Sequence, residues 1–207
     1  MKIGFKNIMV LLALLLGGSS CDSFLDVQPK GEVLEGDLLK DAKGFENALY
    51  GVYAKMGATN LYGQNLSYSA LDLMAQYYTS TNNEEVEPLI KYDYKNTKAE
   101  DLFYNIWCDM YSNIAYANNV LEHLDKFSPS DMQFYNIYKG EALGLRAFMH
   151  FDLLRIFSEQ ITENESADGI PYSTRFSLFA PDILKSKDVY KRIISDLRSA
   201  EQLLDDE

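Results

Sequence analysis

Cysteine, histidine and tryptophan are scarce in this chain of 207 residues, which has two cysteines, two histidines and one tryptophan. Two cysteines cannot build a disulfide framework, and no His-x-x-x-His, Cys-x-x-Cys or calcium-loop spacing offers a metal site. A glycine-rich phosphate loop and a nucleophile-elbow motif are also missing. These absences predict a protein without a cofactor or metal, and they argue against an enzyme.

Basic residues are outnumbered, with 19 Lys and Arg against 31 Asp and Glu and a net charge of -12. Affinity for a nucleic-acid backbone comes mainly from Lys and Arg, so the acidic balance argues against a nucleic-acid partner. The chain is 47% apolar, with only 5 prolines and 12 glycines, which is an ordinary globular composition. Length and composition together predict one domain, or one domain plus a fragment.

The sequence has no apolar run of the roughly twenty residues that a membrane-spanning helix needs. Its first apolar run covers residues 8–16, follows Lys2 and Lys6, and precedes a stretch of small residues that ends at Cys21. This order is typical of a secretory signal peptide, and a cysteine at that place indicates a lipoprotein signal over residues 1–20. Fatty acyl chains such as palmitate on Cys21 would then anchor the protein stably in a membrane.

One position departs from the lipoprotein pattern. Bacterial lipoboxes prefer leucine three residues before the cysteine, and this sequence has Gly18 there. The alternative is ordinary signal cleavage, with Cys21 incidental. We favour lipidation.

The mature chain shows helical patterns separated by segments without them. Residues 21–40 resemble an extended tether, and residues 79–96 and 159–184 lack a sustained period. Apolar residues at helical spacing predict helices over residues 41–56, 65–78, 97–124, 128–157 and from 186 onward, the last with Ser186 as its N-cap. No strand alternation of useful length occurs, so the predicted fold class is all-α.

The third predicted helix has the clearest pattern. Thr97 and Glu100 form a capping box, and seven apolar residues from Phe103 to Leu124, Trp107 among them, recur at alternating steps of four and three. Such a stripe requires a partner helix, which we expect to begin at Ser128 as its N-cap. The short connection predicts an antiparallel pair with Trp107 in its core.

Helix pairs followed by a further amphipathic helix suggest tetratricopeptide-like repeats. The last predicted helix lacks the second helix of its own pair. Either it packs back on the first pair, or the chain is the front part of a longer protein and stops within a repeat. We therefore expect residues 41–207 to form an incomplete α-helical domain.

Several motifs in order resemble SusD/RagB-type outer-membrane nutrient-binding lipoproteins. They are CDSFLD at residues 21–26, ALYGVY at residues 48–53, the W-x-x-x-Y-x-x-I-x-x-x-N-x pattern at residues 107–119, and G-E-A-x-x-L-R-A at residues 140–147. The resemblance implies a surface-exposed, all-α lipoprotein that covers a TonB-dependent, SusC-like outer-membrane barrel and captures glycans or other oligomeric nutrients for import. It also implies a binding protein rather than an enzyme. The family is much longer than this chain, which therefore resembles its N-terminal, SusD-like portion.

Sugar recognition needs aromatic faces for the apolar side of pyranose rings and polar side chains for the hydroxyl groups. The loop at residues 79–96 and its flanks offer both, and in related proteins this region contributes to the ligand face. Its candidate ligand-binding residues are Tyr77, Tyr78, Asn82, Asn83, Tyr92 and Tyr94. The alternative is that Tyr77 lies in the core and that Tyr92 and Tyr94 only cover the domain.

Trp107, Glu141 and Arg146 belong to the recognised motifs, and we expect all three to have structural roles. Nutrient capture is the leading functional hypothesis. A helical-repeat lipoprotein that docks a protein partner is the second, and a non-functional truncated fragment is the third. The aromatic loop discriminates the first two, because only a ligand-binding protein should lose affinity when Tyr92 and Tyr94 are replaced.

Overall fold

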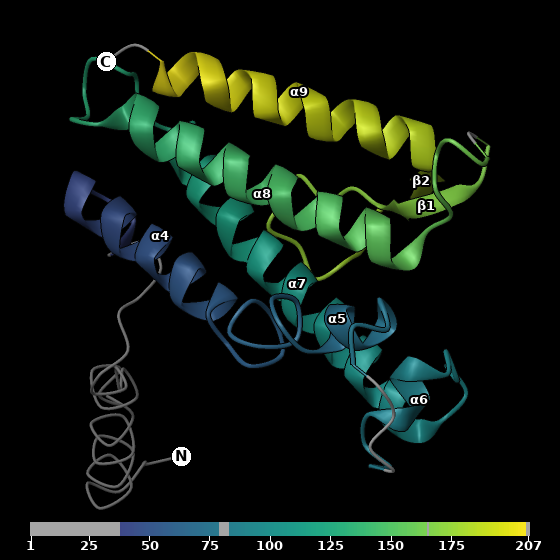
Figure 1. Cartoon of the computed structure of the whole chain (residues 1–207). Coiled ribbons are helices and arrows are strands. Elements are labelled where there is room, and N and C mark those ends of the chain that lie inside the picture. The colour runs from purple at the N-terminus through teal and green to yellow at the C-terminus, as the bar shows by residue number, and fades with distance from the viewer. Residues whose placement is uncertain (1–37, 79–82, 165, 206–207) are drawn as a thin grey trace, which may run out of the picture. The chain divides into compact units, whose positions relative to one another are not determined.

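A computed structural model of the chain describes residues 38–78, 83–164 and 166–205, which are mostly helical (Figure 1). The helices are α4 (Ala42–Met56), α5 (Ala70–Met74), α6 (Glu87–Ile90), α7 (Thr97–Leu124), α8 (Tyr135–Phe157) and α9 (Ser186–Leu204). The predicted all-α class is confirmed, and the tetratricopeptide-like arrangement stays an expectation. The predicted signal peptide and Cys21 lie outside the described residues, as does nearly all of the tether.

The four long helices α4, α7, α8 and α9 follow one another in alternating directions (Figure 1). Helix α8 packs against α7 on one side and α9 on the other, and α4 packs against both α7 and α8. The predicted antiparallel pairing of the third helix with its successor is thus confirmed. The last helix, α9, packs back on α8, which is one of the two alternatives that the sequence left open.

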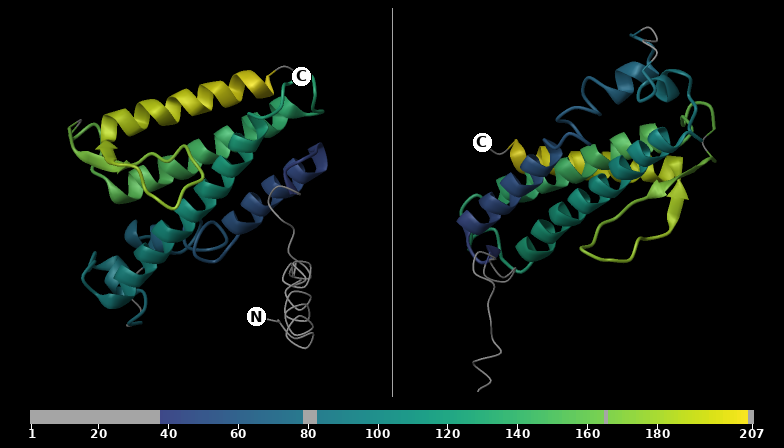
Figure 2. Two further views of the ribbon diagram at one scale, coloured as in Figure 1. Left: turned by 180° about the vertical axis from the view of Figure 1, so that it is seen from behind. Right: turned by 90° about the horizontal axis from the view of Figure 1, so that it is seen from below.

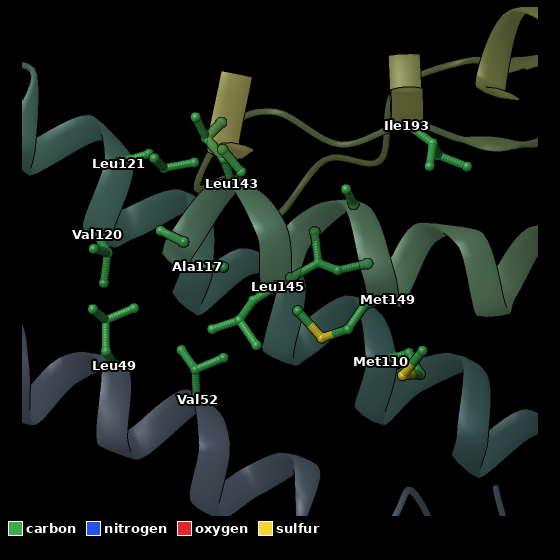
Figure 3. Close-up of a cluster of buried hydrophobic side chains, with 14 of the residues drawn as sticks. Leu49, Val52, Met110, Ala117, Val120, Leu121, Leu143, Leu145, Met149 and Ile193 are labelled. Atoms are coloured by element: carbon green, nitrogen blue, oxygen red, sulfur yellow. The ribbon is translucent and has the colours of Figure 1, made fainter. Parts of the chain in front are cut away.

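The main core lies where α4, α7 and α8 meet, and Figure 3 shows its side chains interdigitating. Leu49 and Val52 come from α4, Ile114 and Ala117 from α7, and Met149 from α8, and each of these residues is at most 2% exposed. Because α8 also buries residues against α9, its apolar side chains occupy two faces instead of one stripe.

Close approach of α9 to α8 depends on a glycine. A Cβ atom built on Gly140 would lie 2.7 Å from Leu204 Cγ and 3.3 Å from the carbonyl oxygen of Ala200. Val189, Ile193 and Ala200 are the main apolar residues that α9 buries in this contact. The small residue in the G-E-A motif therefore allows the two backbones to approach.

The prediction of a second helix over residues 65–78 is wrong for most of that range. Of residues 65–78, only Ala70–Met74 form a helix, and the residues before it form consecutive turns. The turns are closed by local hydrogen bonds, including one from the Tyr68 hydroxyl to the carbonyl oxygen of Gly63 at 2.9 Å. The helix ends because Gln76 adopts a left-handed conformation with φ of 57°.

Three predicted N-caps differ from those observed. Helix α7 is capped by Asn96, whose side chain accepts a hydrogen bond from the backbone of Lys98 at 3.0 Å, so Thr97 is its first residue and not its cap. Helix α8 begins at Tyr135 and not near Ser128, because Phe134 is left-handed with φ of 64°. Ser128 donates its hydroxyl to Asp131 within a turn instead.

Helix α9 begins at Ser186, but the cap is Lys185 and not Ser186. The Ser186 side chain is fully buried and lies 2.8 Å from the hydroxyl of Ser158, at the end of α8. This contact occupies the hydroxyl that the sequence pattern assigns to capping.

Two short strands were not predicted. Strands β1 (Asp168–Pro171) and β2 (Ile183–Lys185) pair antiparallel. Four and three residues are too few for a visible alternation, and Pro171 argues against a strand from sequence. Between the strands, residues 172–182 form a long segment that runs back beside α7 (Figure 2).

Candidate functional site

Two grooves open on the surface of α7, and Trp107 lines both of them. The first has a volume of about 480 Å³ and lies where the ends of α5 and α8 meet the beginning of α7. The residues that line it are Met74, Tyr94, Glu100, Phe103, Tyr104, Trp107, Ile156 and Phe157. Only one of these residues, Glu100, is charged.

The second groove, with a volume of about 810 Å³, lies between α7 and the segment that connects β1 to β2. Helix α7 contributes Tyr111, Ser112 and Tyr116 to it, among others, and the opposite wall consists of Pro171, Ser173 and residues 176–181. Cys108 also lines this groove and is exposed.

Aromatic rings hold Trp107 between the two grooves. Its ring centre lies 4.8 Å from that of Tyr111 and 4.9 Å from that of Phe157, and the Phe157 ring is nearly perpendicular to the indole. Phe103 packs edge-on against Phe157 at 6.1 Å, and Tyr94 packs edge-on against Phe103 at 5.6 Å. The rings therefore support one another in a fixed arrangement.

Hydrogen bonds attach the wall of the second groove to α7. The Tyr111 hydroxyl donates to the carbonyl oxygen of Pro171 at 2.7 Å, at the end of β1. Further along, the backbone N–H of Phe176 donates to Glu122 Oε1 at 3.0 Å. Burial raises the pKa of the Tyr111 hydroxyl, so this group stays protonated and remains a donor.

Beneath this wall, Arg146 connects three helices. Its Nε and Nη2 atoms donate to the two carboxylate oxygens of Asp196 on α9, at 2.7 and 2.9 Å. Its Nη1 atom donates to Asn118 Oδ1 on α7 at 3.0 Å. Arg146 is only 8% exposed, so the pair lies largely out of water. A bidentate, buried pair of this kind restricts how α7, α8 and α9 can move against one another.

His150 is fully buried one turn further along α8. Its Nε2 atom accepts a hydrogen bond from the backbone N–H of Ser173 at 3.0 Å, so the ring proton must reside on Nδ1, which lies 2.8 Å from the carbonyl oxygen of Arg146. The ring also stacks on Tyr172 with 4.0 Å between centres. Burial lowers the pKa of His150 to about 4, so the ring is neutral near pH 7.

The lowered pKa of His150 should make the free energy of unfolding depend on pH. The pKa of His150 is below its unfolded value of 6.5, so the unfolded state gains a proton first and stability falls as the pH drops from about 6.5 towards 4. We expect a loss of about 2 kcal/mol between pH 7.5 and pH 5 from this group, because the slope approaches about 1.36 kcal/mol per pH unit once the pH is below the unfolded pKa. Urea unfolding at the two pH values measures it.

A single variant isolates the effect. The charged and titratable groups around the His150 ring are Arg146 on its own helix, Asp196 on α9, Tyr111 on α7 and Tyr172 in the segment after β1. His150→Gln should lose about 2 kcal/mol less than the unmodified chain over this interval. Equal losses in the two proteins would contradict the assignment.

Of the residues in the predicted aromatic loop, Tyr94 lines the first groove. Its ring lies 6.4 Å from that of Tyr92, whose hydroxyl donates to the carbonyl oxygen of Met74 at 2.6 Å. Tyr92 thus ties the short α6 region to the end of α5 and lies beside the groove without lining it.

Tyr77, Tyr78 and Asn83 line neither groove. Tyr77 and Tyr78 are exposed, so the alternative that Tyr77 is a core residue is wrong. Asn83 uses its side-chain oxygen to accept the backbone N–H of Glu85 at 2.9 Å, at the start of the turn into α6. Asn82 lies outside the described residues.

The three motif residues Arg146, Glu141 and Trp107 differ in how deeply they are buried. Arg146 is buried, as described above. Glu141 is half-buried and accepts a long hydrogen bond of 3.5 Å from the Tyr53 hydroxyl, and burial raises the pKa of its carboxyl group. Trp107 is half-buried between the grooves, whereas the heptad stripe predicts it in the core.

Sequence reasoning missed Tyr104, Tyr111 and Tyr116 as groove residues. A signal was available for two of them, because Tyr104, Trp107 and Tyr111 are spaced three and four residues apart and therefore share one face of α7. This second stripe runs beside the apolar one. The segment at residues 176–181 gave no signal of its own.

Within the described ranges, no group of three or more His, Cys, Asp and Glu residues could hold a metal ion. Among the same residues, no helix has the length and apolar character required to span a membrane. The two grooves are lined mainly by aromatic and apolar side chains and by the hydroxyl groups of tyrosine and serine.

The SusD-like family model described as "Starch-binding associating with outer membrane" matches residues 23–207. The chain belongs to the SusD-like family, and the family expected from the motifs is confirmed.

The chain is also similar to individual proteins and solved structures. SusD-like protein P38 of Formosa agariphila is 26% identical over 208 residues, which is 97% of this chain and 38% of that protein. A SusD superfamily protein from Bacteroides fragilis has a TM-score of 0.66 at 24% identity, covering 78% of this chain and 39% of that one. A SusD-like carbohydrate binding protein from Bacteroides vulgatus has a TM-score of 0.60 at 24% identity, covering 79% and 36%. The chain spans less than two fifths of the length of these relatives.

Proposed function

We propose that this chain belongs to a surface lipoprotein that binds glycans and works with a TonB-dependent, SusC-like outer-membrane barrel to import them. The family, described as starch-binding and associated with the outer membrane, supports the proposal. Acylation of Cys21 would supply the anchor. The proposed activity is binding and not catalysis.

The position of Trp107 is the observation that carries the glycan-binding role. Its half-buried indole lies between two grooves whose other ring-bearing residues include Tyr94, Tyr104 and Tyr116, all of them at least 46% exposed. Aromatic faces pack against the apolar faces of sugar rings, and the tyrosine hydroxyls can exchange hydrogen bonds with sugar hydroxyls. Tyr77, Tyr78, Asn82, Asn83 and Tyr92 stay candidates for an extension of this surface from the neighbouring loop.

Intrinsic fluorescence tests the proposal, because Trp107 is the only tryptophan in the chain. We expect titration with maltoheptaose, or with another neutral oligosaccharide in a panel, to change the Trp107 emission. Tyr104→Ala should weaken that binding by about fivefold to tenfold, the loss of one exposed aromatic contact of about 1 kcal/mol. Calorimetry of the same titration gives the dissociation constant independently.

Tyr50→Ala is the matched control, since Tyr50 is comparably exposed, lies on α4, lines neither groove, and donates a hydrogen bond to Glu46 of its own helix. It should bind the oligosaccharide like the unmodified chain. An affinity-tagged chain expressed in its source bacterium should also co-purify with a TonB-dependent barrel. A chain that binds no glycan in the panel and brings down no such barrel would contradict the proposal.

One observation favours the second candidate, a lipoprotein that docks a protein partner. Leu178 and Phe179 are 101% and 86% exposed at the tip of the 172–182 segment. Exposed apolar side chains of this size are typical of protein interfaces. If docking is the function, Leu178→Ser should abolish partner capture, while Tyr104→Ala should leave it unchanged.

A further inference from the structure

Asn118 lies beneath the wall of the second groove and contacts that wall directly. Its side chain is fully buried on α7. The Nδ2 atom donates to the carbonyl oxygens of Ser173 at 3.1 Å and Arg175 at 3.2 Å, and lies 3.4 Å from the Ser173 hydroxyl. One side-chain amide therefore contacts the backbone of the groove wall at two places.

The direction of this amide is determined by its other neighbour. A guanidinium group can only donate hydrogen bonds, so Asn118 must turn its oxygen towards Arg146 Nη1 and its nitrogen towards the groove wall. Arg146 is itself held by both oxygens of Asp196. The Tyr172 hydroxyl donates to the same carboxylate at 2.5 Å, and burial together with that carboxylate raises the pKa of Tyr172, so it stays a donor.

The groove wall has little else to hold it. Every residue from 174 to 182 is exposed, so apolar burial contributes little to its position. Its polar anchors are Asn118, the His150 ring, which accepts from Ser173 N–H, Glu122, which accepts from Phe176 N–H, and, where the wall begins, the Tyr111 hydroxyl, which donates to Pro171. Asn118 is the only one of these four that holds the wall through two carbonyl groups.

We propose that Asn118 is a positioning residue for the second groove. Oriented by the Arg146–Asp196 pair, it holds residues 173–175 against α7 and so sets the width of the groove beside Trp107. This places the shape of a surface on α7 under the control of a residue of α9 that does not itself line the groove. The proposal rests on the proposed function only for the expectation that groove shape affects glycan binding.

Asn118→Asp tests the proposal by removing the donor and keeping the acceptor. The aspartate can still pair with Arg146, but its second oxygen would face the carbonyl oxygens of Ser173 and Arg175 and repel them. In the full chain without ligand, amide hydrogen exchange at Ser173 and Phe176 should accelerate by about tenfold or more, as for the loss of a buried hydrogen bond. Acrylamide quenching of Trp107 fluorescence should increase, because the opposite groove wall withdraws.

Asn105→Asp is the matched control. It adds the same charge to the same helix at an exposed position that lines neither groove, so exchange and quenching should stay unchanged. Unchanged exchange at Ser173 and Phe176 in a folded Asn118→Asp protein would overturn the proposal. A protein that merely unfolds would instead lose protection throughout α7 and α8.

The unmodified chain supplies a test that does not depend on the variant folding. Its Ser173 and Phe176 amides should be protected while those of residues 177–180 exchange rapidly. Equal, rapid exchange at all of these positions would overturn the proposal. Because neither readout requires a sugar, failure here is distinguishable from failure of glycan binding. If both proposals hold, Asn118→Asp also weakens maltoheptaose binding, and Asn105→Asp does not.

Discussion

Replacing Arg146 by methionine should lower the free energy of unfolding by about 3–5 kcal/mol, the cost of leaving a buried charge without its partner. Asp196 would keep only its contact with Tyr172, and Asn118 Oδ1 would lose its donor. Urea unfolding followed by circular dichroism measures the change. The buried geometry makes this the largest effect that a single polar substitution should have in the described structure.

A second substitution separates the cost of the unpaired charge from the value of the pair. The double variant Arg146→Met with Asp196→Leu should recover a substantial part of the loss, because a buried pair replaced by apolar side chains leaves no isolated charge. Lys191→Met is the control, since it breaks an exposed pair with Asp188 and should leave the unfolding midpoint unchanged. A single Arg146→Met variant as stable as the unmodified chain would show that the pair has no structural role.

Ile114→Ala should lower the free energy of unfolding by about 2–5 kcal/mol, through lost apolar burial and the cavity left behind. Ile114 is fully buried on α7, in the core cluster that α4, α7 and α8 share. Thermal unfolding of the variant measures the loss. The same variant should retain the Trp107 emission of the folded protein, because Ile114 lines neither groove.

Tyr104→Ala, on the same helix, should have almost no effect on stability. Tyr104 is 67% exposed and lines the first groove, so its removal should change stability by about 0.5 kcal/mol or less. Comparison of the two variants shows whether the core face and the groove face of α7 act independently. An Ile114→Ala protein within 1 kcal/mol of the unmodified chain would mean that the core relaxes around the loss.

The long helices were predictable because their patterns extend over many turns. The stripe from Phe103 to Leu124 identifies α7, and Tyr190, Ile193 and Leu197 identify α9. Helix ends were less predictable, since several candidate caps compete. Asn96 caps α7 in place of Thr97, and α8 begins several residues later than predicted, after the left-handed Phe134. Short elements such as α5 and β2 carry too few residues for any period to show.

The grooves were only partly predictable. The sequence pointed to the aromatic loop, of which Tyr94 lines a groove, but it assigned Trp107 to the core. A 3.5-residue period identifies the apolar face of a helix, not how far a partner covers it. Phe157 is the last residue of α8 and meets Trp107 edge-on, so the indole lies where cover by α8 ends and is left half-exposed.

The family, the all-α class and the order of the long helices follow from local periodicity and contiguous motifs, so they could be predicted without a structure. The surroundings of Trp107 and the anchors of the second groove follow instead from how the helices pack. Asn118 meets Ser173 and Arg146 meets Asp196 across 55 and 50 residues of chain. Contacts between residues so far apart arise from how α7, α8 and α9 pack, and no local pattern in the sequence encodes them. The position of the one tryptophan, Trp107, between two grooves therefore depends on residues that lie far from it along the chain.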